Sequence, residues 1–296
     1  MTSLGSWRST LDPTRMMQVD VTHWQMQEHY QRTEQLTIEE PFEIRIEHRS
    51  LAVIMRTPGD DFELAWGFLF SEGLIQRPSD VLALEYEQDA EGLPLPNVIN
   101  VTLRSAALLE ASLPTCLPPG NFARHFAVSS SCGLCGKDSI ENAMRTALPL
   151  EQPDTLAIKA TVLYKLAQSL RGQQTVFSYT GGLHAAGLFS CDGELLLLRE
   201  DVGRHNAVDK LIGYGLMHDL GQTRSLYPYR ERVLLVSGRT SFEIVQKALL
   251  ARIPCLAAIS APSSLAVELA DSGGITLVGF LRDVAMNVYT HPERIV

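Results

Sequence analysis

The sequence predicts a layered α/β fold built on a mixed sheet, with a smaller β-rich subdomain at its N-terminal end. Two patterns carry this prediction: strand and helix patterns alternate after about residue 126, and short strands separated by turns fill residues 36–125. Strands separated by helices of this length pack as a sheet with helices on its faces. The chain has 296 residues, of which 45% are hydrophobic, so it can bury a full core.

The chain divides into three predicted parts. Residues 1–35 are polar, rich in Gln, Thr and Met, and without clean periodicity, so we expect a polar N-terminal tail. Residues 36–125 form the β-rich subdomain and residues 126–296 form the α/β domain. Prolines and a glycine between residues 114 and 120 mark the boundary, because these residues interrupt regular structure.

The elements follow in order from local patterns. Phe42–Ile46 alternates apolar and polar residues, which predicts a half-buried strand, and a helix is predicted to begin at the acidic capping residues Asp60 and Asp61. The predicted strands are 42–46, 51–55, 98–103, 175–179, 195–199, 233–237, 255–259 and 275–280. The predicted helices are 60–70, 138–148, 207–214, 242–252 and 264–270.

Composition excludes several classes of protein. A net charge of −9 argues against a general nucleic-acid binder, which needs a basic surface. No apolar run approaches the ~18 residues of a membrane span. Residues 1–15 lack the basic-then-apolar pattern of a secretory signal, and the five cysteines leave at least one thiol unpaired. We therefore expect a cytoplasmic protein that binds neither nucleic acid nor membrane.

Two thiols, Cys132 and Cys135, form the most informative feature of the chain. Each thiol is followed by a glycine, Lys137 lies two residues after Cys135, and the predicted helix 138–148 comes directly afterwards. The helix N-terminus and the lysine both favour thiolate over thiol, and thiolate is the form that attacks sulfur or binds metal. The pattern therefore indicates chemistry at this pair.

Four interpretations of the pair remain open. The thiols could be buried as small apolar residues, although the glycines and polar neighbours argue against burial. They could form half of a zinc site, but Cys116, Cys191 and Cys255 are scattered singly and complete no second pair. They could form a thioredoxin-like dithiol, or one of them could be a nucleophile that carries a group while the other assists.

Three strand-to-helix junctions carry polar loops that suit an anionic ligand, because ligands of open α/β sheets gather at such junctions. They are residues 199–206, 237–241 and 260–264. In the second loop, Gly238 permits close approach, Arg239 can bind a phosphate, and Thr240 or Ser241 can cap the next helix. Three such loops on one sheet indicate a large phosphorylated ligand. Positive charge could come from Arg204, His205, Lys210, Arg239 and Lys247.

Histidines raise a metal hypothesis. Zinc-dependent nucleobase deaminases need His-x-Glu together with Pro-Cys-x-x-Cys. Here His184 is followed by two alanines, and Ser131 precedes Cys132, so deaminase chemistry is not expected. His184, in a glycine-rich turn, is either a packed histidine or a site residue, whereas His205, at a helix start, favours a functional role.

Six motifs in register resemble the formate dehydrogenase accessory sulfurtransferase (FdhD) family. They cover the chain from about residue 36 to 296, which leaves only the predicted tail outside. The motifs are RTPGDD at 56–61, CGLCGK at 132–137, TGGLHAA at 180–186, EDVGRHNAVDK at 200–210, SGRTSFE at 237–243 and APSSLAVE at 261–268.

The resemblance implies a cytidine-deaminase-like core without deaminase chemistry, a homodimer, and no permanent metal. It implies transfer of sulfur from a cysteine desulfurase to the molybdenum bis(molybdopterin guanine dinucleotide) cofactor, before that cofactor enters formate dehydrogenase. The persulfide-carrying cysteine of the family corresponds to Cys132, with Cys135 as its partner. A thiol suited to such exchange has a pKa near ambient pH.

The resemblance also places cofactor contacts near the C-terminus. The corresponding segment is Phe280, Leu281, Arg282, Asp283, Val284 and Ala285. Many relatives carry a glycine and a second arginine there, and this chain lacks both. Two rival classes remain: a thiol–disulfide oxidoreductase, and a zinc-bound module that uses the cysteine pair with His184 or His205.

Overall fold

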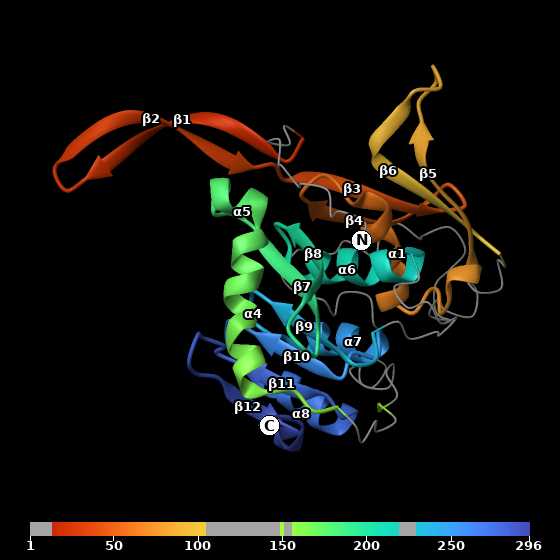
Figure 1. Ribbon diagram of the computed structural model, residues 1–296. Coiled ribbons are helices and arrows are strands. Elements are labelled where there is room, and N and C mark those ends of the chain that lie inside the picture. Colours follow the sequence, from red (N-terminus) through yellow and green to blue (C-terminus); the bar gives the residue numbers. More distant parts are fainter. Residues whose placement is uncertain (1–13, 105–148, 151–155, 219–228) are drawn as a thin grey trace, which may run out of the picture.

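The computed structural model describes residues 14–104, 149–150, 156–218 and 229–296 (Figure 1). Cys116, Cys132, Cys135, the predicted helix 138–148 and the predicted boundary at 114–120 lie outside the described residues. The division near residue 125 and the function of the cysteine pair therefore stay predictions.

A six-stranded mixed sheet forms the centre of the molecule, in the order β12-β11-β10-β9-β7-β8. Its strands are β7 (His184–Ser190), β8 (Leu195–Asp201), β9 (Arg232–Val236), β10 (Cys255–Ala258), β11 (Thr276–Gly279) and β12 (Asn287–Thr290). Strands β9, β10 and β11 are parallel, while β7 and β12 run antiparallel to their neighbours. The predicted layered α/β fold with a mixed sheet is confirmed, and the deaminase-like character of its core stays a prediction.

Helices cover both faces of this sheet (Figure 1). Helices α6 (Arg204–His218), α7 (Phe242–Leu250) and α8 (Ser264–Gly273) contribute to one buried core together with alternate residues of the strands. Helix α4 (Ala160–Gln173) packs Leu163, Leu166 and Leu170 against the other face in a second core. The same strands contribute to both cores, because successive side chains along a strand point to opposite faces of the sheet.

A second sheet of four strands, in the order β4-β3-β6-β5, forms the N-terminal part. Its elements are β3 (Glu40–Ile46), β4 (Arg49–Arg56), α1 (Asp61–Ser71), the 3₁₀ turn Pro78–Asp80, β5 (Val81–Gln88) and β6 (Pro94–Leu103). Helix α1 joins this sheet to the main domain by packing on α6, and two glycines allow close contact. A Cβ on Gly67 would lie 1.9 Å from the carbonyl oxygen of Asp209, and one on Gly213 would lie 1.9 Å from that of Glu63.

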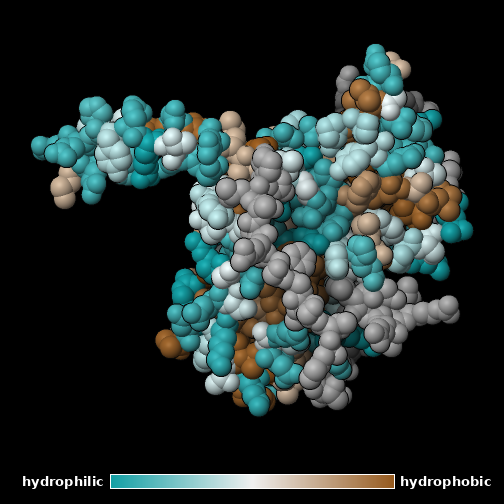
Figure 2. Space-filling view, turned by 45° about the horizontal axis from the view of Figure 1, so that its top comes forward, coloured by the Kyte–Doolittle hydropathy of each residue, from teal (hydrophilic) through white to brown (hydrophobic). Residues whose placement is uncertain are grey.

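The segment expected as a tail instead contains a β-hairpin, so this prediction is wrong for residues 16–35. Strands β1 (Met16–Gln25) and β2 (Glu28–Thr37) pair along their whole length and project from the body (Figure 1). The two strands were not predicted, because both faces of the hairpin are largely exposed to solvent (Figure 2) and polar residues therefore interrupt the apolar–polar alternation of the sequence.

The strand predicted at 175–179 is also wrong, because helix α5 (Thr175–Thr180) occupies it. β-Branched and aromatic residues favoured a strand, but the Glu200 carboxylate accepts hydrogen bonds from the N–H groups of Val176 and Phe177, at 3.1 and 3.0 Å. A carboxylate at these orphan donors stabilises a helical first turn. The helix then ends at Gly181 with φ of +67°.

The other predicted elements within the described residues are confirmed, with ends shifted by a few residues. The predictions missed β5, α4, β7, β12 and the short 3₁₀ turns Pro78–Asp80 and Pro292–Arg294. Within the described ranges, no helix is long and apolar enough to cross a membrane.

Candidate functional site

The predicted polar loops meet along one edge of the main sheet, which we call the rim. The rim is formed by the carboxyl ends of β8, β9, β10 and β11 and by the amino end of β7, because β7 runs antiparallel to both β8 and β9. Loops 237–241 and 260–264 are joined directly. The Thr240 N–H donates to Ala261 O at 3.1 Å, and the Ser263 N–H donates to Thr240 O at 2.9 Å.

Three predicted site residues from separate motifs contact one another at the rim. His184 begins β7, Arg204 begins α6, and Gly238 follows β9. A Cβ on Gly238 would lie 3.2 Å from His184 Nδ1, which is a tight contact, and 3.5 Å from Arg204 Cδ. The three residues therefore lie close together, and the role of Gly238 in the approach of a ligand stays a prediction.

Several polar groups at the rim lack a partner. Thr240 is 1% exposed, and its Oγ1 has no hydrogen-bond partner among the described residues; the same holds for the buried Nε of Arg204. Arg239 is exposed, and within the described ranges neither arginine forms an ion pair. Buried polar groups are normally bonded, so polar groups that have no partner within the described ranges suit an anionic ligand.

The two histidines at the rim are neutral near pH 7. Burial, with the positive charges of Arg204 and Arg239, lowers the pKa of His184 against an opposing contribution from Asp201. Burial, with contributions from the neighbouring Lys247, Arg204 and His184, lowers the pKa of His205 to about 3. The His205 Nε2 lies 3.0 Å from Glu243 Oε2, and we interpret this contact as a hydrogen bond from neutral imidazole rather than an ion pair.

The C-terminal segment 280–285 extends the rim. The Phe280 N–H donates to Ser260 O at 3.1 Å, while Leu281 is fully buried and anchors the segment in the core. Phe280 has φ of +51°, a conformation that is rare for a bulky residue and is concentrated at functional sites. The side chain of Phe280 is 43% exposed, and Asp283, Val284 and Ala285 are also exposed.

Arg282 has a structural role in this segment. Its guanidinium donates to Ile259 O at 2.6 Å and to Leu281 O at 3.0 Å, and its N–H donates to Ala285 O at 2.8 Å. These bonds fix segment 280–285 to the end of β10. Of the predicted phosphate ligands at the rim, Arg204 and Arg239 are therefore the arginines whose guanidinium groups form no ion pair with any residue that the structure describes.

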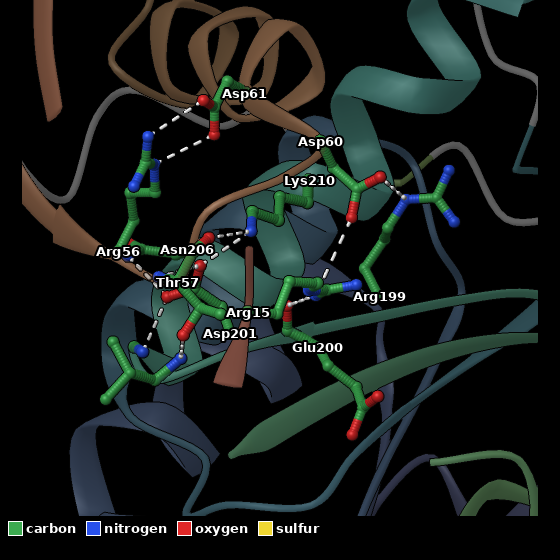
Figure 3. Close-up of polar contacts among 12 residues, drawn as sticks. Arg15, Arg56, Thr57, Asp60, Asp61, Arg199, Glu200, Asp201, Asn206 and Lys210 are labelled. Atoms are coloured by element: carbon green, nitrogen blue, oxygen red, sulfur yellow. Dashed lines mark hydrogen bonds and ion pairs between the residues drawn. The ribbon is translucent and has the colours of Figure 1, made fainter. Parts of the chain in front are cut away.

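A buried network lies behind the rim (Figure 3). The Asp201 carboxylate accepts hydrogen bonds from Lys210 Nζ at 2.8 Å, Asn206 Nδ2 at 2.9 Å, the Gly203 N–H at 2.8 Å and the Thr57 N–H at 3.1 Å. Asp201 and Lys210 are both fully buried. The network fixes the β8–α6 loop, which leads into Arg204 and His205 at the start of α6, to the β4–α1 loop.

The expectation that Lys210 and Lys247 supply charge to a ligand is wrong. Lys210 is enclosed by Asp201 and by Thr57 O, and Lys247 Nζ lies 2.8 Å from both carboxylate oxygens of Asp209. Sequence reasoning missed the organising role of Asp201 and Thr57. The available signal in the sequence was that Thr57 lies in the motif at 56–61 and Asp201 in the motif at 200–210, and that both motifs belong to the set that resembles one family.

The arrangement gives no metal centre among the described residues, where no group of three or more His, Cys, Asp or Glu side chains could hold a metal ion. Cys132 and Cys135 lie outside these residues, so the alternative of a zinc site that uses them stays a hypothesis.

Fold and rim together define a mixed-sheet α/β protein with a donor-rich, partly cationic edge. Comparison with known proteins gives the family. The model of the FdhD/NarQ family matches residues 37–296, and the chain belongs to this family.

Named relatives agree with this membership. The "Sulfur carrier protein FdhD" of Mycolicibacterium paratuberculosis is 47% identical over 93% of this chain and 97% of its own length. The protein of the same name from Saccharolobus solfataricus is 40% identical over 95% of this chain and 98% of its own length. A crystal structure from Desulfotalea psychrophila, assigned as a formate dehydrogenase accessory protein, superposes with a TM-score of 0.69 at 23% identity, covering 95% of this chain and all of that one. This last likeness supports the fold.

Proposed function

We propose that this protein is a sulfur carrier that serves formate dehydrogenase maturation in the cytoplasm. It takes persulfide sulfur from a cysteine desulfurase and transfers it to the molybdenum bis(molybdopterin guanine dinucleotide) cofactor before that cofactor enters the dehydrogenase. Family membership and the relatives named sulfur carriers support the first part. The observation that carries the second part is the convergence of His184, Arg204, Gly238, Arg239 and Thr240 at one rim.

The sulfur step follows from thiol chemistry. The Cys132 thiolate attacks the outer sulfur of the donor persulfide, so that a new S–S bond forms on Cys132 while the donor S–S bond breaks and the donor cysteine leaves as a thiolate. No net oxidation occurs, because one persulfide is exchanged for another. Cys135 either carries sulfur as well or releases it by forming a disulfide with Cys132.

The rim holds the phosphorylated arms of the substrate. Arg204 and Arg239 offer guanidinium forks, which bind phosphate oxygens in pairs, and Gly238 has no side chain between its backbone and the neighbouring His184 and Arg204. Because His184 and His205 are neutral, they offer hydrogen bonds without adding charge. The buried Asp201 network keeps the loop of Arg204 in place, which reduces the entropy lost on binding.

Intact-mass spectrometry tests the sulfur step. After incubation with a cysteine desulfurase and cysteine, we expect a gain of one sulfur atom that a reductant removes. Cys132→Ala should abolish the gain, whereas Cys191→Ala, a matched loss of a thiol remote from the pair in sequence, should retain it. A full gain in Cys132→Ala would move the carrier role to Cys135, and no gain in the unaltered protein would refute the proposal.

A further inference from the structure

A series of polar contacts leads from the rim into the protein between helices α6 and α7, and the proposed function does not explain it. It begins at His205, whose Nε2 lies 3.0 Å from Glu243 Oε2. Glu243 Oε1 lies 3.9 Å from Lys247 Nζ, one turn further along α7, and Lys247 Nζ lies 2.8 Å from Asp209 Oδ1. The exposed fraction of the side chains falls from 15% for His205 and 17% for Glu243 to 3% for Lys247 and Asp209. The two outer residues are therefore the ones that a ligand at the rim can reach.

Glu243 is not needed to pair Lys247. The distance of 3.9 Å between Glu243 Oε1 and Lys247 Nζ exceeds that of a hydrogen bond, whereas Lys247 Nζ lies 2.8 Å from both carboxylate oxygens of Asp209. A helix N-terminus favours an acidic residue in its first turn, but this preference requires no contact with a histidine. Among the described residues, the hydrogen-bond partner of the Glu243 carboxylate is His205. The contact between these two side chains is thus the feature that needs an explanation.

This contact fixes the tautomer of His205. The ring is neutral, because burial, above all, lowers its pKa to about 3, and a neutral imidazole carries one proton. A carboxylate only accepts hydrogen bonds, so the nitrogen that faces Glu243 must carry the proton. Ser241 Oγ lies 3.3 Å from the same nitrogen and can accept from it as well. With the proton on Nε2, Nδ1 is an acceptor.

The acceptor nitrogen is unused within the part of the chain that the structure describes. Both hydrogen-bonding neighbours of His205 there, Glu243 and Ser241, face Nε2, and none faces Nδ1. The ring lies in the first turn of α6, directly after Arg204. A ring that is held through one nitrogen loses little freedom when the other nitrogen binds a ligand. His205 is therefore prepared to accept one hydrogen bond at the rim.

The chemistry of an acceptor selects the ligand group that it binds. An ionised phosphate offers oxygen acceptors, so it suits the guanidinium groups of Arg204 and Arg239 and not an unprotonated Nδ1. The donors of a nucleotide are the ribose hydroxyls and the N–H groups of the base. The hydroxyls belong to the sugar that carries the phosphate, whereas the base edge lies beyond that sugar. Because Arg204 directly precedes His205, a hydroxyl is the donor nearest to a phosphate bound at Arg204.

We infer that Glu243 is a positioning residue of the rim, which holds His205 with its proton on Nε2 so that Nδ1 accepts a hydrogen bond from a ribose hydroxyl of the ligand. The inference rests on the proposed function, because it takes the rim as the site of a nucleotide arm. It divides the recognition of that arm, since the arginines bind phosphate and His205 binds the sugar. It also gives a role to Glu243, the last residue of the motif at 237–243.

The tautomer is tested without any ligand, by nitrogen-15 NMR of the imidazole rings at pH 7. With the His205 signals identified by their loss in His205→Gln, we expect a protonated Nε2 and an unprotonated Nδ1. Glu243→Leu removes the acceptor while Lys247 keeps Asp209, so its His205 ring should show both tautomers. The matched control is Glu268→Leu, an exposed glutamate of α8, which should leave the His205 signals unchanged. A proton on Nδ1 in the unaltered protein, or an unchanged ring in Glu243→Leu, would overturn the assignment.

The contact with the ribose is tested by calorimetry with GDP, 2′-deoxy-GDP and 3′-deoxy-GDP. One of the deoxynucleotides should bind the unaltered protein roughly two- to tenfold more weakly than GDP, which is the effect of one neutral hydrogen bond. Glu243→Leu should lose this discrimination and Glu268→Leu should keep it, whereas a merely structural defect would weaken all three nucleotides equally.

The outcomes separate this inference from the proposed function. Equal affinities of the three nucleotides for the unaltered protein would overturn the inference and leave the proposed function standing. A preference for GDP over IDP that Glu243→Leu abolishes, with no preference over the deoxynucleotides, would assign the contact to the base and also overturn it. If the unaltered protein binds no GDP, the proposed role of the rim is itself refuted, and the contact with the ribose is refuted with it.

Discussion

Gly67→Ala is expected to destabilise the protein strongly, because it separates the two helices that join the N-terminal sheet to the main domain. The new methyl carbon would lie 1.9 Å from Asp209 O, whereas ordinary van der Waals contact begins at 3.4 Å. Helices α1 and α6 would therefore have to move apart by the difference, 1.5 Å. The obstructing atom is backbone, so no side-chain rotation relieves the contact.

Asp209, which Gly67→Ala would displace, is also part of a buried ion pair. The Asp209 carboxylate binds Lys247 Nζ at 2.8 Å and accepts a hydrogen bond from Ser71 Oγ on α1 at 2.8 Å. Overpacking costs about 1–3 kcal/mol, and separating a buried pair costs up to ~5 kcal/mol. We expect a loss of at least about 2 kcal/mol, which lowers the melting temperature by roughly 4 °C or more in a protein of this size.

Thermal unfolding followed by circular dichroism measures the effect. The matched control is Gly172→Ala in α4, where a Cβ would meet nothing within 4 Å and alanine should raise helix stability slightly. GDP serves as a stand-in for one guanine dinucleotide arm of the proposed substrate. Because α6 begins at Arg204, Gly67→Ala should also weaken the binding of GDP at the rim. Equal melting temperatures for the two variants would refute the close-contact argument.

Three further predictions concern the rim. Arg239→Ala should weaken GDP binding about tenfold or more in calorimetry, since a charge-assisted hydrogen bond is worth roughly 1.5–3 kcal/mol, while Arg77→Ala on the distant 3₁₀ turn should not; equal affinities would make Arg239 structural. Asp283→Asn should lose more affinity for GDP than for IDP if the carboxylate accepts from the guanine amine, and equal tightening of both would indicate simple repulsion. His205 has a pKa of about 3 when folded against 6.5 ordinarily, so the unfolded chain takes up the proton first and stability falls as pH drops from 6.5 towards 3. His205→Gln should flatten this part of the urea-unfolding profile relative to the unaltered protein, and an unchanged slope would contradict the buried, neutral state.

Much of the main domain could be predicted because local and global preferences agree there. The runs that became β9, β10 and β11 are apolar throughout and buried on both faces, as parallel strands are. Strand β7 was not predicted, because its Gly187 follows other glycines and the whole segment resembled a loop. Gly187 lies inside the strand, where Leu170 and Phe189 leave no room for a Cβ, so this glycine is explained by packing and not by a turn.

Failures of local prediction share one physical cause, which is a partner distant in sequence. Helix α5 depends on the Glu200 carboxylate, more than twenty residues away, and no feature of 175–180 alone indicates that cap. The hairpin of β1 and β2 is similar, since its strands are largely exposed and are recognised by their pairing with each other. Propensity is a weak guide where tertiary contacts decide.

The same reasoning applies to the candidate site. Loops at the carboxyl ends of parallel strands meet at one edge of a sheet, which explains why the loops of Arg204, Gly238 and Arg239 lie near one another, while their role in binding a ligand stays a prediction. The lysines could not be assigned, because Asp209 and Lys210 are sequence neighbours that point to different sides of α6. Lys210 pairs with Asp201, while Asp209 pairs with Lys247 on α7. These cross-pairings neutralise two of the five expected cations, and burial removes the charge of His205. Of the five expected cations, Arg204 and Arg239 therefore remain as the two that form no ion pair among the described residues.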